Sequence, residues 1–503
     1  MKLIDLLKNS AQNEPQTTAV KSEETNLTYR QLLTYVNRTA EHLKSIVARK
    51  GANIAIILGN CPEFFIAFFA VSAADATVLP LSPAMTTYES LFFLKRADVS
   101  IVLTNEKYSR LLLNDKNRQK TKNLTIINIK YFRNSILKIR TEAKAQCPIN
   151  KQTENVALMV HTSGTTGKPK LVMLTDSQLI SNMFLYSSLM NFKQKNIVYC
   201  SLLLHHIYCI CAQLLTHIYR TDTFILRNKP FFIKEFINQV HDNNVTITAF
   251  VPYMAILLAE VKNQKKKLQS LKYVTLSGAK TPKATYETLT KKFPHINFIN
   301  TYGMSEAGSR IAIAAPFPKN FPVESVGKPM PGVDVRIVDD NHNLLPPNTT
   351  GQIQVRSSGV AKGYYKQPKL TEKTIKNNWL NTGDIGKLDK KQNLFIIGRK
   401  KDIIISGANN LYPSEIEQIL IEHPAVSQAV VVPKKDQRLQ EIPVAFIVTK
   451  SHKNIETHEL IAFCRKKLST FKIPRLIKTI RKIPKLDTSK INRKKLKKMA
   501  DNL

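Results

Sequence analysis

The chain has 503 residues, 43% of them hydrophobic, so it can bury a large core and should divide into more than one domain. This composition excludes a disordered or fibrous protein. The 75 basic and 37 acidic residues give a formal net charge of +38, which admits nucleic acid, an anionic membrane surface or a small polyanion as a partner.

The basic residues are spread along the whole chain, and neither a zinc finger nor a sheet motif with paired aromatic residues accompanies them. A general enrichment in lysine explains this distribution better than a dedicated anionic partner does. The charge alone therefore assigns no partner, and we expect no nucleic acid.

No segment predicts membrane insertion or secretion. The longest strongly apolar stretch, residues 64–74, is too short to span a bilayer and precedes Asp75, so we predict a buried helix. The N-terminal apolar run is interrupted by Asp5 and lacks a small-residue cleavage site, which favours a cytoplasmic protein. The cysteines lack disulfide-framework spacing, and we expect free thiols. They are Cys61, Cys147, Cys200, Cys209, Cys211 and Cys464.

Helical and strand patterns alternate from Thr28 to about residue 100 and resume near residue 271. Capping boxes at residues 28–31 and 86–89 each open a helix that precedes a short apolar strand. Such alternation is typical of βαβ units and predicts parallel sheets covered by helices. The expected strands are residues 53–58, 77–81, 100–103, 271–277 and 297–301, with a helix opened by Thr281 and Pro282.

The sequence pattern changes at Val326. From there to Gly398 it predicts short strands separated by turns that contain Pro and Gly. These strands, such as residues 333–338 and 352–356, indicate a β-rich subdomain. A smaller α/β unit follows a domain boundary at residues 400–402. Its expected elements are a helix near residues 413–422, strands near 429–432 and 444–448, and a basic tail.

One ordered string of small, hydroxylated and basic residues follows the apolar strand expected at residues 156–160. Its glycines let the backbone fold around an anion, its hydroxyls donate hydrogen bonds to phosphate oxygens and its lysines supply charge. It is no Walker A loop, because the glycines are too close together and Pro169 follows the lysine. The string is Thr162, Ser163, Gly164, Thr165, Thr166, Gly167, Lys168, Pro169 and Lys170.

This string resembles the phosphate-binding loop of the adenylate-forming superfamily, which includes acyl-CoA synthetases, luciferases and peptide-synthetase adenylation domains. Further motifs match in the superfamily's order as far as Arg493. The resemblance implies an AMP-forming acid–thiol ligase that makes acyl-AMP from a carboxylate and ATP, and then passes the acyl group to a thiol. It implies ATP, Mg²⁺ and coenzyme A, or a phosphopantetheinyl carrier protein, as cofactors. The implied ATP-binding loop residues are Thr162, Ser163, Gly164, Thr165, Thr166, Gly167 and Lys170.

Residues 302–306 resemble the segment that holds the adenine and the metal. By that resemblance Tyr302 stacks on the adenine, Ser305 meets the phosphate and Glu306 coordinates Mg²⁺, whose preference for oxygen suits a carboxylate.

Two later motifs resemble those that contact the ribose. A carboxylate can accept both ribose hydroxyls, which assigns Asp384 to that role with Arg399 beside it. The tripeptide at residues 277–279 is similar to the segment beside the adenine and the acyl pocket, which places Ala279 at the nucleotide.

The C-terminal motifs resemble the superfamily's hinge, with Lys401 at the pivot, and its catalytic segment, whose lysine matches Lys490. We therefore predict an α/β protein with a large domain of βαβ units and a β-rich subdomain over residues 1–399, a hinge at 400–402 and a small mobile α+β domain over 403–503. Lys490 would place a cation between the reacting oxygen and phosphorus.

Residues 203–208 fall where the superfamily carries a gate to the acyl pocket. We favour His206 as the gate, although the adjacent His205 leaves the register open. The remaining predicted pocket residues are Tyr208, Gly278 and Gly303. The cysteines near these histidines match no common zinc spacing, so we favour a buried pocket wall.

The same segment lacks the Asp with which peptide-synthetase domains pair the substrate's α-amino group. Burying an ammonium without a partner is costly, so we predict a non-amino aliphatic or aryl carboxylic acid, with a fatty acid as the first choice. A ligase that loads an acyl-carrier protein stays open. So does a catalytically silent nucleotide-binding homologue, because Leu171 and Ser489 stand where the superfamily usually has Gly.

Overall fold

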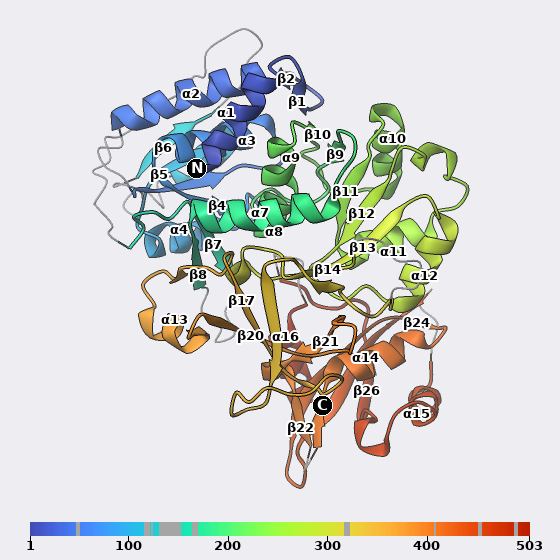
Figure 1. The fold of residues 1–503 in the computed structure, drawn as a ribbon. Helices are drawn as coiled ribbons and strands as arrows, with labels where there is room; N and C mark the ends of the chain where they lie inside the picture. The colour runs from blue at the N-terminus through green and yellow to red at the C-terminus, as the bar shows by residue number, and fades with distance from the viewer. Residues whose placement is uncertain are drawn as a thin grey trace. The chain divides into compact units, whose positions relative to one another are not determined.

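The computed structural model describes residues 1–46, 51–114, 121, 124–129, 152–162, 170–315, 322–406, 409–450, 455–486 and 491–503. The chain divides into two compact units (Figure 1). The first consists of Met1–Thr281, Thr285–Val335 and Val355–Leu380, and the second of Pro282–Ala284, Arg336–Gln354 and Asn381–Leu503. The predicted hinge at residues 400–402 stays a prediction.

One sheet of the first unit is parallel at its centre and antiparallel at one edge. Its strands read as near-continuous apolar runs because both faces are covered, and all residues of β3, β4 and β5 are buried. In order across the sheet they are β18 (Gly363–Tyr364), β8 (Lys170–Leu174), β7 (Leu158–Thr162), β4 (Thr77–Leu81), β3 (Asn53–Ile57), β5 (Val99–Thr104) and β6 (Thr125–Asn128).

A second sheet of the first unit has parallel central strands with antiparallel strands at both edges. Its apolar core is built with α10, α11 and α12, among others through Phe236 and Phe250, whose ring centroids are 5.1 Å apart. The strand order is β15 (Lys328–Pro329), β14 (Ala312–Ile313), β13 (Asn297–Tyr302), β12 (Tyr273–Leu276), β11 (Ile247–Phe250), β9 (Ile197–Tyr199), β10 (Thr223–Ile225), β1 (Thr18–Lys21) and β2 (Asn26–Thr28).

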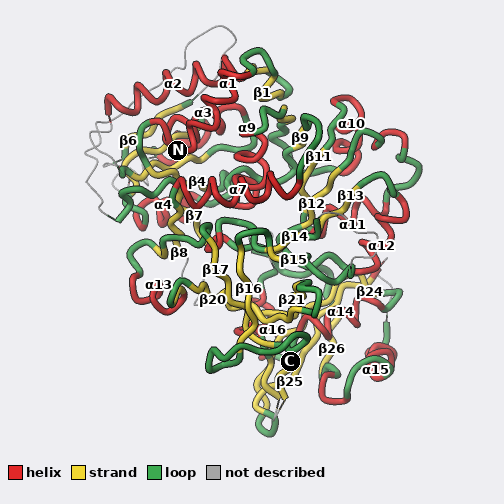
Figure 2. The backbone as a smooth tube through the Cα atoms, viewed as in Figure 1, coloured by secondary structure: helices red, strands yellow, loops and turns green. Residues whose placement is uncertain are grey.

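Helices surround these sheets, as Figure 2 shows in red beside the yellow strands. Both predicted capping boxes are present: Thr28 and Gln31 exchange side-chain and backbone hydrogen bonds, as do Thr86 and Glu89. The helices are α1 (Leu3–Asn13), α2 (Tyr29–Ile46), α3 (Pro62–Ala73), α4 (Thr87–Arg96), α5 (Glu106–Leu112), α7 (Asp176–Met190), α8 (Ile207–Cys209), α9 (Thr216–Tyr219), α10 (Ile233–Asn243), α11 (Pro252–Glu260), α12 (Lys283–Lys292) and α13 (Pro368–Thr374). Shorter turns are the π-helix η1 (Ile210–Leu215) and the 3₁₀ helices η2 (Lys266–Leu268) and η3 (Ser305–Ala307).

The predicted β-rich subdomain is present as a sheet whose strands continue from the first unit into the second. Its order is β16 (Val333–Val338), β17 (Gly351–Ser357), β20 (Trp379–Leu388) and β19 (Ile375–Lys376), with β21 (Leu394–Arg399) also paired to β20.

The rest of the second unit is a separate sheet with its own apolar core. The strands are β23 (Asn409–Leu411), β22 (Ile404–Ser406), β25 (Gln440–Thr449) and β24 (Val426–Asp436), with β26 (Leu476–Thr479) parallel to β25. The helices are α14 (Pro413–Glu422), α15 (Thr457–Arg465) and α16 (Arg493–Asp501), with the short turns η4 (Lys400–Asp402) and η6 (Thr470–Lys472).

Part of the expected basic tail forms α16. Leu496 and Ala500 recur at helical spacing and are buried with Val430 and Val432 of β24, while the lysines between them face outward. Together with the partly buried Met499, these two residues pack the short, highly charged helix against the sheet.

The described helices include none that is long and apolar enough to cross a membrane. The apolar stretch at residues 64–74 forms most of α3, which is buried as predicted. The described cysteines, Cys61, Cys200, Cys209, Cys211 and Cys464, are free thiols.

Candidate active site

Parallel strands β9, β11, β12 and β13 end at the same edge of their sheet. Segments that follow the carboxyl ends of parallel strands are the usual place for a ligand in α/β folds. The segments here are residues 200–208 after β9, Val251 after β11, residues 277–279 after β12 and residues 303–306 after β13. Predicted nucleotide and pocket residues therefore meet at one edge, although they are far apart in the sequence.

The segment after β13 folds back sharply on itself. The backbone N–H of Ile311 donates to the carbonyl oxygen of Tyr302 over 2.8 Å, so the intervening residues form a closed turn. A Cβ on Gly303 would lie 1.5 Å from the carbonyl oxygen of Ser309, which leaves no room for a side chain. Ser309 itself has φ of 102°, a left-handed value that costs a non-glycine residue energy. Tyr302, Ser305 and the predicted metal ligand sit on this tight turn.

Glu306, the predicted metal ligand, is held by two hydrogen bonds. Tyr364 Oη in β18 donates to Glu306 Oε1 over 2.9 Å, and the backbone N–H of Ala361 donates to the Glu306 carbonyl oxygen over 2.9 Å. Burial raises the pKa of Tyr364 well above its usual range and the Glu306 charge adds to that effect, so the phenol stays a donor. Among the described residues, no group donates to Glu306 Oε2, which leaves that oxygen available to a cation.

Lys170, the last residue of the predicted phosphate loop, belongs to the same group. Lys170 is only 8% exposed, and its Nζ lies 5.0 Å from the centroid of the Tyr364 ring. Its cross-strand partner is Thr162, so strands β7 and β8 bring the two ends of the loop together. Ser163, Gly164, Thr165, Thr166 and Gly167 lie outside the described residues.

Leu171, which stands where the superfamily usually has glycine, is part of the hydrophobic core. Its side chain is fully buried in β8 and packs in the core with Met159 and Tyr365. The backbone N–H of Tyr365 also donates to the Leu171 carbonyl oxygen over 2.9 Å. The leucine therefore adds to the core and gives no support to a silent homologue.

The segment after β12 needs a glycine at one position. Gly278 has φ of +88°, which L-residues rarely adopt, and both Gly278 and Ala279 are exposed beyond the end of the strand. This places the two predicted residues at the same sheet edge as Tyr302, because β12 and β13 are paired in register.

The segment after β9 carries the predicted gate. His205 is only 6% exposed, and burial, with His206 and His161 nearby, holds the pKa of His205 well below its usual range, so it is neutral near pH 7. His206 is more exposed and precedes α8, and its role as the gate stays a prediction. Tyr208 Oη donates to Thr275 Oγ1 of β12 over 2.8 Å, which ties the segment to the sheet.

Asn60, which the sequence did not suggest, fixes this segment. Its Nδ2 donates to the carbonyl oxygens of Cys200 and Leu202, and its Oδ1 accepts from the N–H of Leu204. The side chain is buried, so these bonds also satisfy its own polar atoms.

In the second unit, the predicted ribose contacts face each other across an antiparallel pair. Asp384 in β20 is the register partner of Arg399 in β21, and Arg399 Nε lies 2.9 Å from Asp384 Oδ1. Asp384 is 4% exposed, whereas about half of the Arg399 side chain is exposed. The pair is therefore a fixed carboxylate with a more accessible cation beside it.

The predicted hinge residue Lys401 lies in η4, and partial burial lowers the pKa of its ammonium group. Lys490 lies outside the described residues, but the chain on both sides of it is fixed. Lys485 and Ile491 form an antiparallel bridge, and Arg493 Nη2 pairs with Glu417 Oε1 over 2.7 Å. Two motifs that matched the superfamily separately thus contact each other.

The described residues contain no group of three or more His, Cys, Asp and Glu side chains placed to hold a metal. A Mg²⁺ ion needs no such cage, because it commonly keeps several waters and binds one or two carboxylates together with substrate phosphates. Glu306, with one oxygen fixed by Tyr364, fits that mode.

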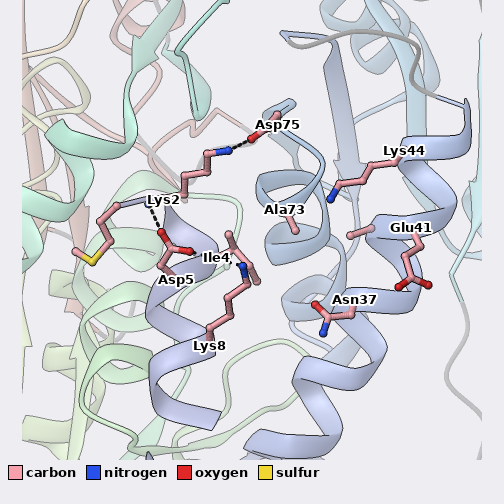
Figure 3. Close-up of a pocket in the computed structure, with 11 residues that line it drawn as sticks. Lys2, Ile4, Asp5, Lys8, Asn37, Glu41, Lys44, Ala73 and Asp75 are labelled. Carbon is pink, nitrogen blue, oxygen red and sulfur yellow. Dashed lines mark hydrogen bonds and ion pairs between the residues drawn. The ribbon is translucent and has the colours of Figure 1, made fainter. Parts of the chain in front are cut away.

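A cavity of about 480 Å³ lies apart from this site, between α1, α2 and α3 (Figure 3). Lys2, Lys8 and Lys44 line it together with Asp5, Glu41 and Asp75, and Lys2 is paired with Asp75. Its opposite charges offset one another, and it contains none of the predicted site residues.

Comparison with known proteins defines the class. Residues 7–365 match the AMP-binding enzyme family, and residues 415–490 match the AMP-binding enzyme C-terminal domain. The chain therefore belongs to the AMP-binding enzyme family. The predicted α/β fold and the predicted class, an AMP-forming acid–thiol ligase of the adenylate-forming superfamily, are confirmed.

Among its relatives, the chain is similar to 2-succinylbenzoate--CoA ligase of Bacillus cereus and of Bacillus mycoides, at 28% identity over 492 residues and 97% of both chains in each case. It resembles the structure of o-succinylbenzoate CoA synthetase from Bacillus subtilis with the acyl-adenylate intermediate OSB-AMP, with a TM-score of 0.84 and 26% identity over 98% of this chain and 97% of that one. ATP-bound MatB from Rhodopseudomonas palustris shares the fold, with a TM-score of 0.88 at 21% identity over 100% and 99% of the two chains.

Proposed function

We propose that this ligase activates an aromatic keto acid of the 2-succinylbenzoate type and transfers the acyl group to coenzyme A. The observation that carries the proposal is the likeness over 97% of both chains to ligases named for that acid and that thiol. The first choice made from the sequence, a fatty acid, receives no support from these relatives. The absence of an Asp near residues 205–208 argued against an amino acid as the substrate, but it could not distinguish aliphatic from aromatic acids.

The first step joins a carboxylate oxygen to the α-phosphorus of ATP and releases pyrophosphate. An anion must approach a polyanion, so the barrier is largely electrostatic. We assign Glu306 to Mg²⁺, which would neutralise charge on the phosphates when bound. Lys170 and the loop from Thr162 hold the phosphates, Tyr302 and Ala279 the adenine, and Ser305 a phosphate oxygen.

The remaining assignments lie in the second unit. Asp384 accepts the ribose hydroxyls with Arg399 beside it, and Lys490 offsets charge between the reacting oxygen and phosphorus. In the second step the thiol sulfur bonds to the acyl carbon and its proton passes to water, while the bond to AMP breaks and AMP leaves with the electron pair. Lys490 and the thiol need the same face of the acyl-AMP, so we propose that rotation at Lys401 separates the steps.

Removal of the Tyr364 hydroxyl tests the metal assignment. In Tyr364→Phe the ring beneath Lys170 remains, but Glu306 loses the donor that orients its carboxylate. A hydrogen bond to a charged group contributes about 1.5–3 kcal/mol, so we expect the Mg²⁺ concentration for half-maximal adenylation to rise about tenfold.

Tyr365→Phe is the matched control. The Tyr365 hydroxyl also donates to a carboxylate, Asp98, over 2.6 Å, but it does not touch Glu306. An equal change in Mg²⁺ dependence in both variants would contradict the assignment of Glu306 to the metal.

The proposed function is tested by pyrophosphate release over a panel of carboxylic acids that includes 2-succinylbenzoate, straight-chain fatty acids and benzoate. Coenzyme A and a phosphopantetheinylated carrier protein are compared as acceptors. We expect release to depend most strongly on 2-succinylbenzoate and thioester to form with coenzyme A. Preference for a fatty acid, or thioester formation on the carrier protein alone, would overturn the proposal.

A further inference from the structure

A buried arginine follows the turn that carries Glu306. Arg310 is only 1% exposed, and its guanidinium carbon lies 3.3 Å from the centroid of the Tyr186 ring and 5.4 Å from that of Tyr208. The faces of the two rings attract the cation, but they carry no formal negative charge. The guanidinium is therefore removed from water without an ion partner from these neighbours.

Among the residues that the structure describes, few acceptors face its N–H groups. Nη2 makes one long hydrogen bond of 3.5 Å to the carbonyl oxygen of Ala212, and Nε and Nη1 are buried with no partner among the described residues. An arginine stays charged in proteins and carries five N–H donors. Burying such a group without an anion is costly, because neither solvent nor a carboxylate replaces the lost hydration.

The position of Arg310 connects it with the acyl pocket. Tyr208 and Gly303 were both predicted to line that pocket, and both adjoin Arg310: the first through its ring, the second because a Cβ on it would lie 2.9 Å from Arg310 Cα. The charge is also felt by buried groups around it. Burial raises the pKa of Tyr186 and of Cys211 to about 12, and Arg310 opposes that rise in both.

We propose that Arg310 binds the second, non-reacting carboxylate of the substrate, a role that rests on the proposed function. Two parallel N–H···O bonds from Nε and a terminal nitrogen match the geometry of a carboxylate. The reacting carboxylate is a poor candidate for this place, because a bidentate ion pair would withdraw the electron pair that attacks phosphorus. An alkyl chain would leave the guanidinium unpaired, so the site selects for diacids.

The wild-type enzyme gives the first test. 2-Succinylbenzoate is compared with 4-oxo-4-phenylbutanoate, which has the same reacting side chain but lacks the ring carboxylate. A site built to bind a polar group rejects an analogue without it strongly, so we expect kcat/KM for pyrophosphate release to favour the diacid by at least about 10²-fold.

Variants of Arg310 then assign that preference to one side chain. Arg310→Met should lower kcat/KM for the diacid by about 10²-fold or more while the value for the monoacid changes by less than about threefold. Arg310→Lys should keep part of the preference for the diacid, because lysine carries the positive charge but lacks the paired N–H donors of the guanidinium. Arg220→Met is the matched control, since Arg220 also stacks on a ring, that of Phe192, but pairs with Asp222.

The outcomes separate the two proposals. If neither acid is activated, the proposed function is wrong, and the proposed role of Arg310, which depends on it, is wrong as well. If the wild type activates both acids equally, the role of Arg310 is overturned and the proposed function stands. If Arg310→Met does not fold, the role of Arg310 is still tested by the ratio of kcat/KM for the diacid to that for the monoacid, measured in the wild type and in Arg310→Lys. Equal loss with both acids would make Arg310 a structural residue only.

Discussion

Replacing Lys490 with alanine will slow acyl-AMP formation by about 10²–10³-fold, because the loss of one preorganised donor at the reacting centre typically costs that much. Transfer from supplied acyl-AMP to coenzyme A should stay within a few-fold of wild type, since no charge repulsion with ATP remains to be offset. Lys490 itself lies outside the described residues; before and after it, Lys485 and Ile491 form an antiparallel bridge, and Arg493 pairs with Glu417.

Single-turnover kinetics of each half-reaction measure this division. Lys494→Ala is the matched control, because it removes the same charge from an exposed position on α16 of the same basic segment of the sequence. It should leave both half-reactions unchanged. Equal slowing of both steps in Lys490→Ala, or equal behaviour of the two variants, would show that Lys490 does not act in adenylation.

Gly303→Ala will abolish most of the activity and destabilise the first unit. The new Cβ would meet the Ser309 carbonyl oxygen and the Arg310 Cα, which are backbone atoms and cannot turn aside. Overpacking of this kind costs about 1–3 kcal/mol or more. The turn would open and displace Tyr302 and Glu306, and a misplacement of about 1 Å costs about 10²-fold in rate.

Thermal unfolding and kcat/KM together measure that effect. Gly398→Ala is the control, because the nearest heavy atom to its Cβ, Ser414 Oγ, lies at an ordinary contact distance of 3.5 Å. We expect a lower Tm and a loss of adenylation in Gly303→Ala and an unchanged Tm in the control. An active Gly303→Ala enzyme with wild-type Tm would mean that the turn has a different backbone.

The elements that the sequence predicted well are those with strong local signals. Strands β3, β4 and β5 are apolar throughout because both faces are covered, and the predicted strand at residues 77–81 matches β4 residue for residue. Helix α14 begins and ends as expected because Pro413 starts it. Helix α16 was missed because its two buried residues are outnumbered by lysines.

The residues of the candidate site could be predicted only where they belong to a motif that resembles one of the superfamily. The order of the motifs suggested that Asp384 and Arg399 act together, and the antiparallel register of β20 and β21 pairs them. Tyr364 and Glu306 are 58 residues apart, and no pattern in the sequence indicates that one orients the other. Arg310 likewise reads as one of many basic residues, and only its burial and its unpaired nitrogens distinguish it.

Trapping the intermediate shows whether this enzyme works through acyl-AMP. The protein is mixed with ATP, Mg²⁺ and 2-succinylbenzoate without coenzyme A, and the products are quenched and identified by mass spectrometry; coenzyme A is then added. We expect about one acyl-AMP for each protein molecule with release of pyrophosphate, followed by conversion of the acyl-AMP into the thioester and AMP. Formation of ADP and phosphate, or thioester formation without prior acyl-AMP, would contradict it.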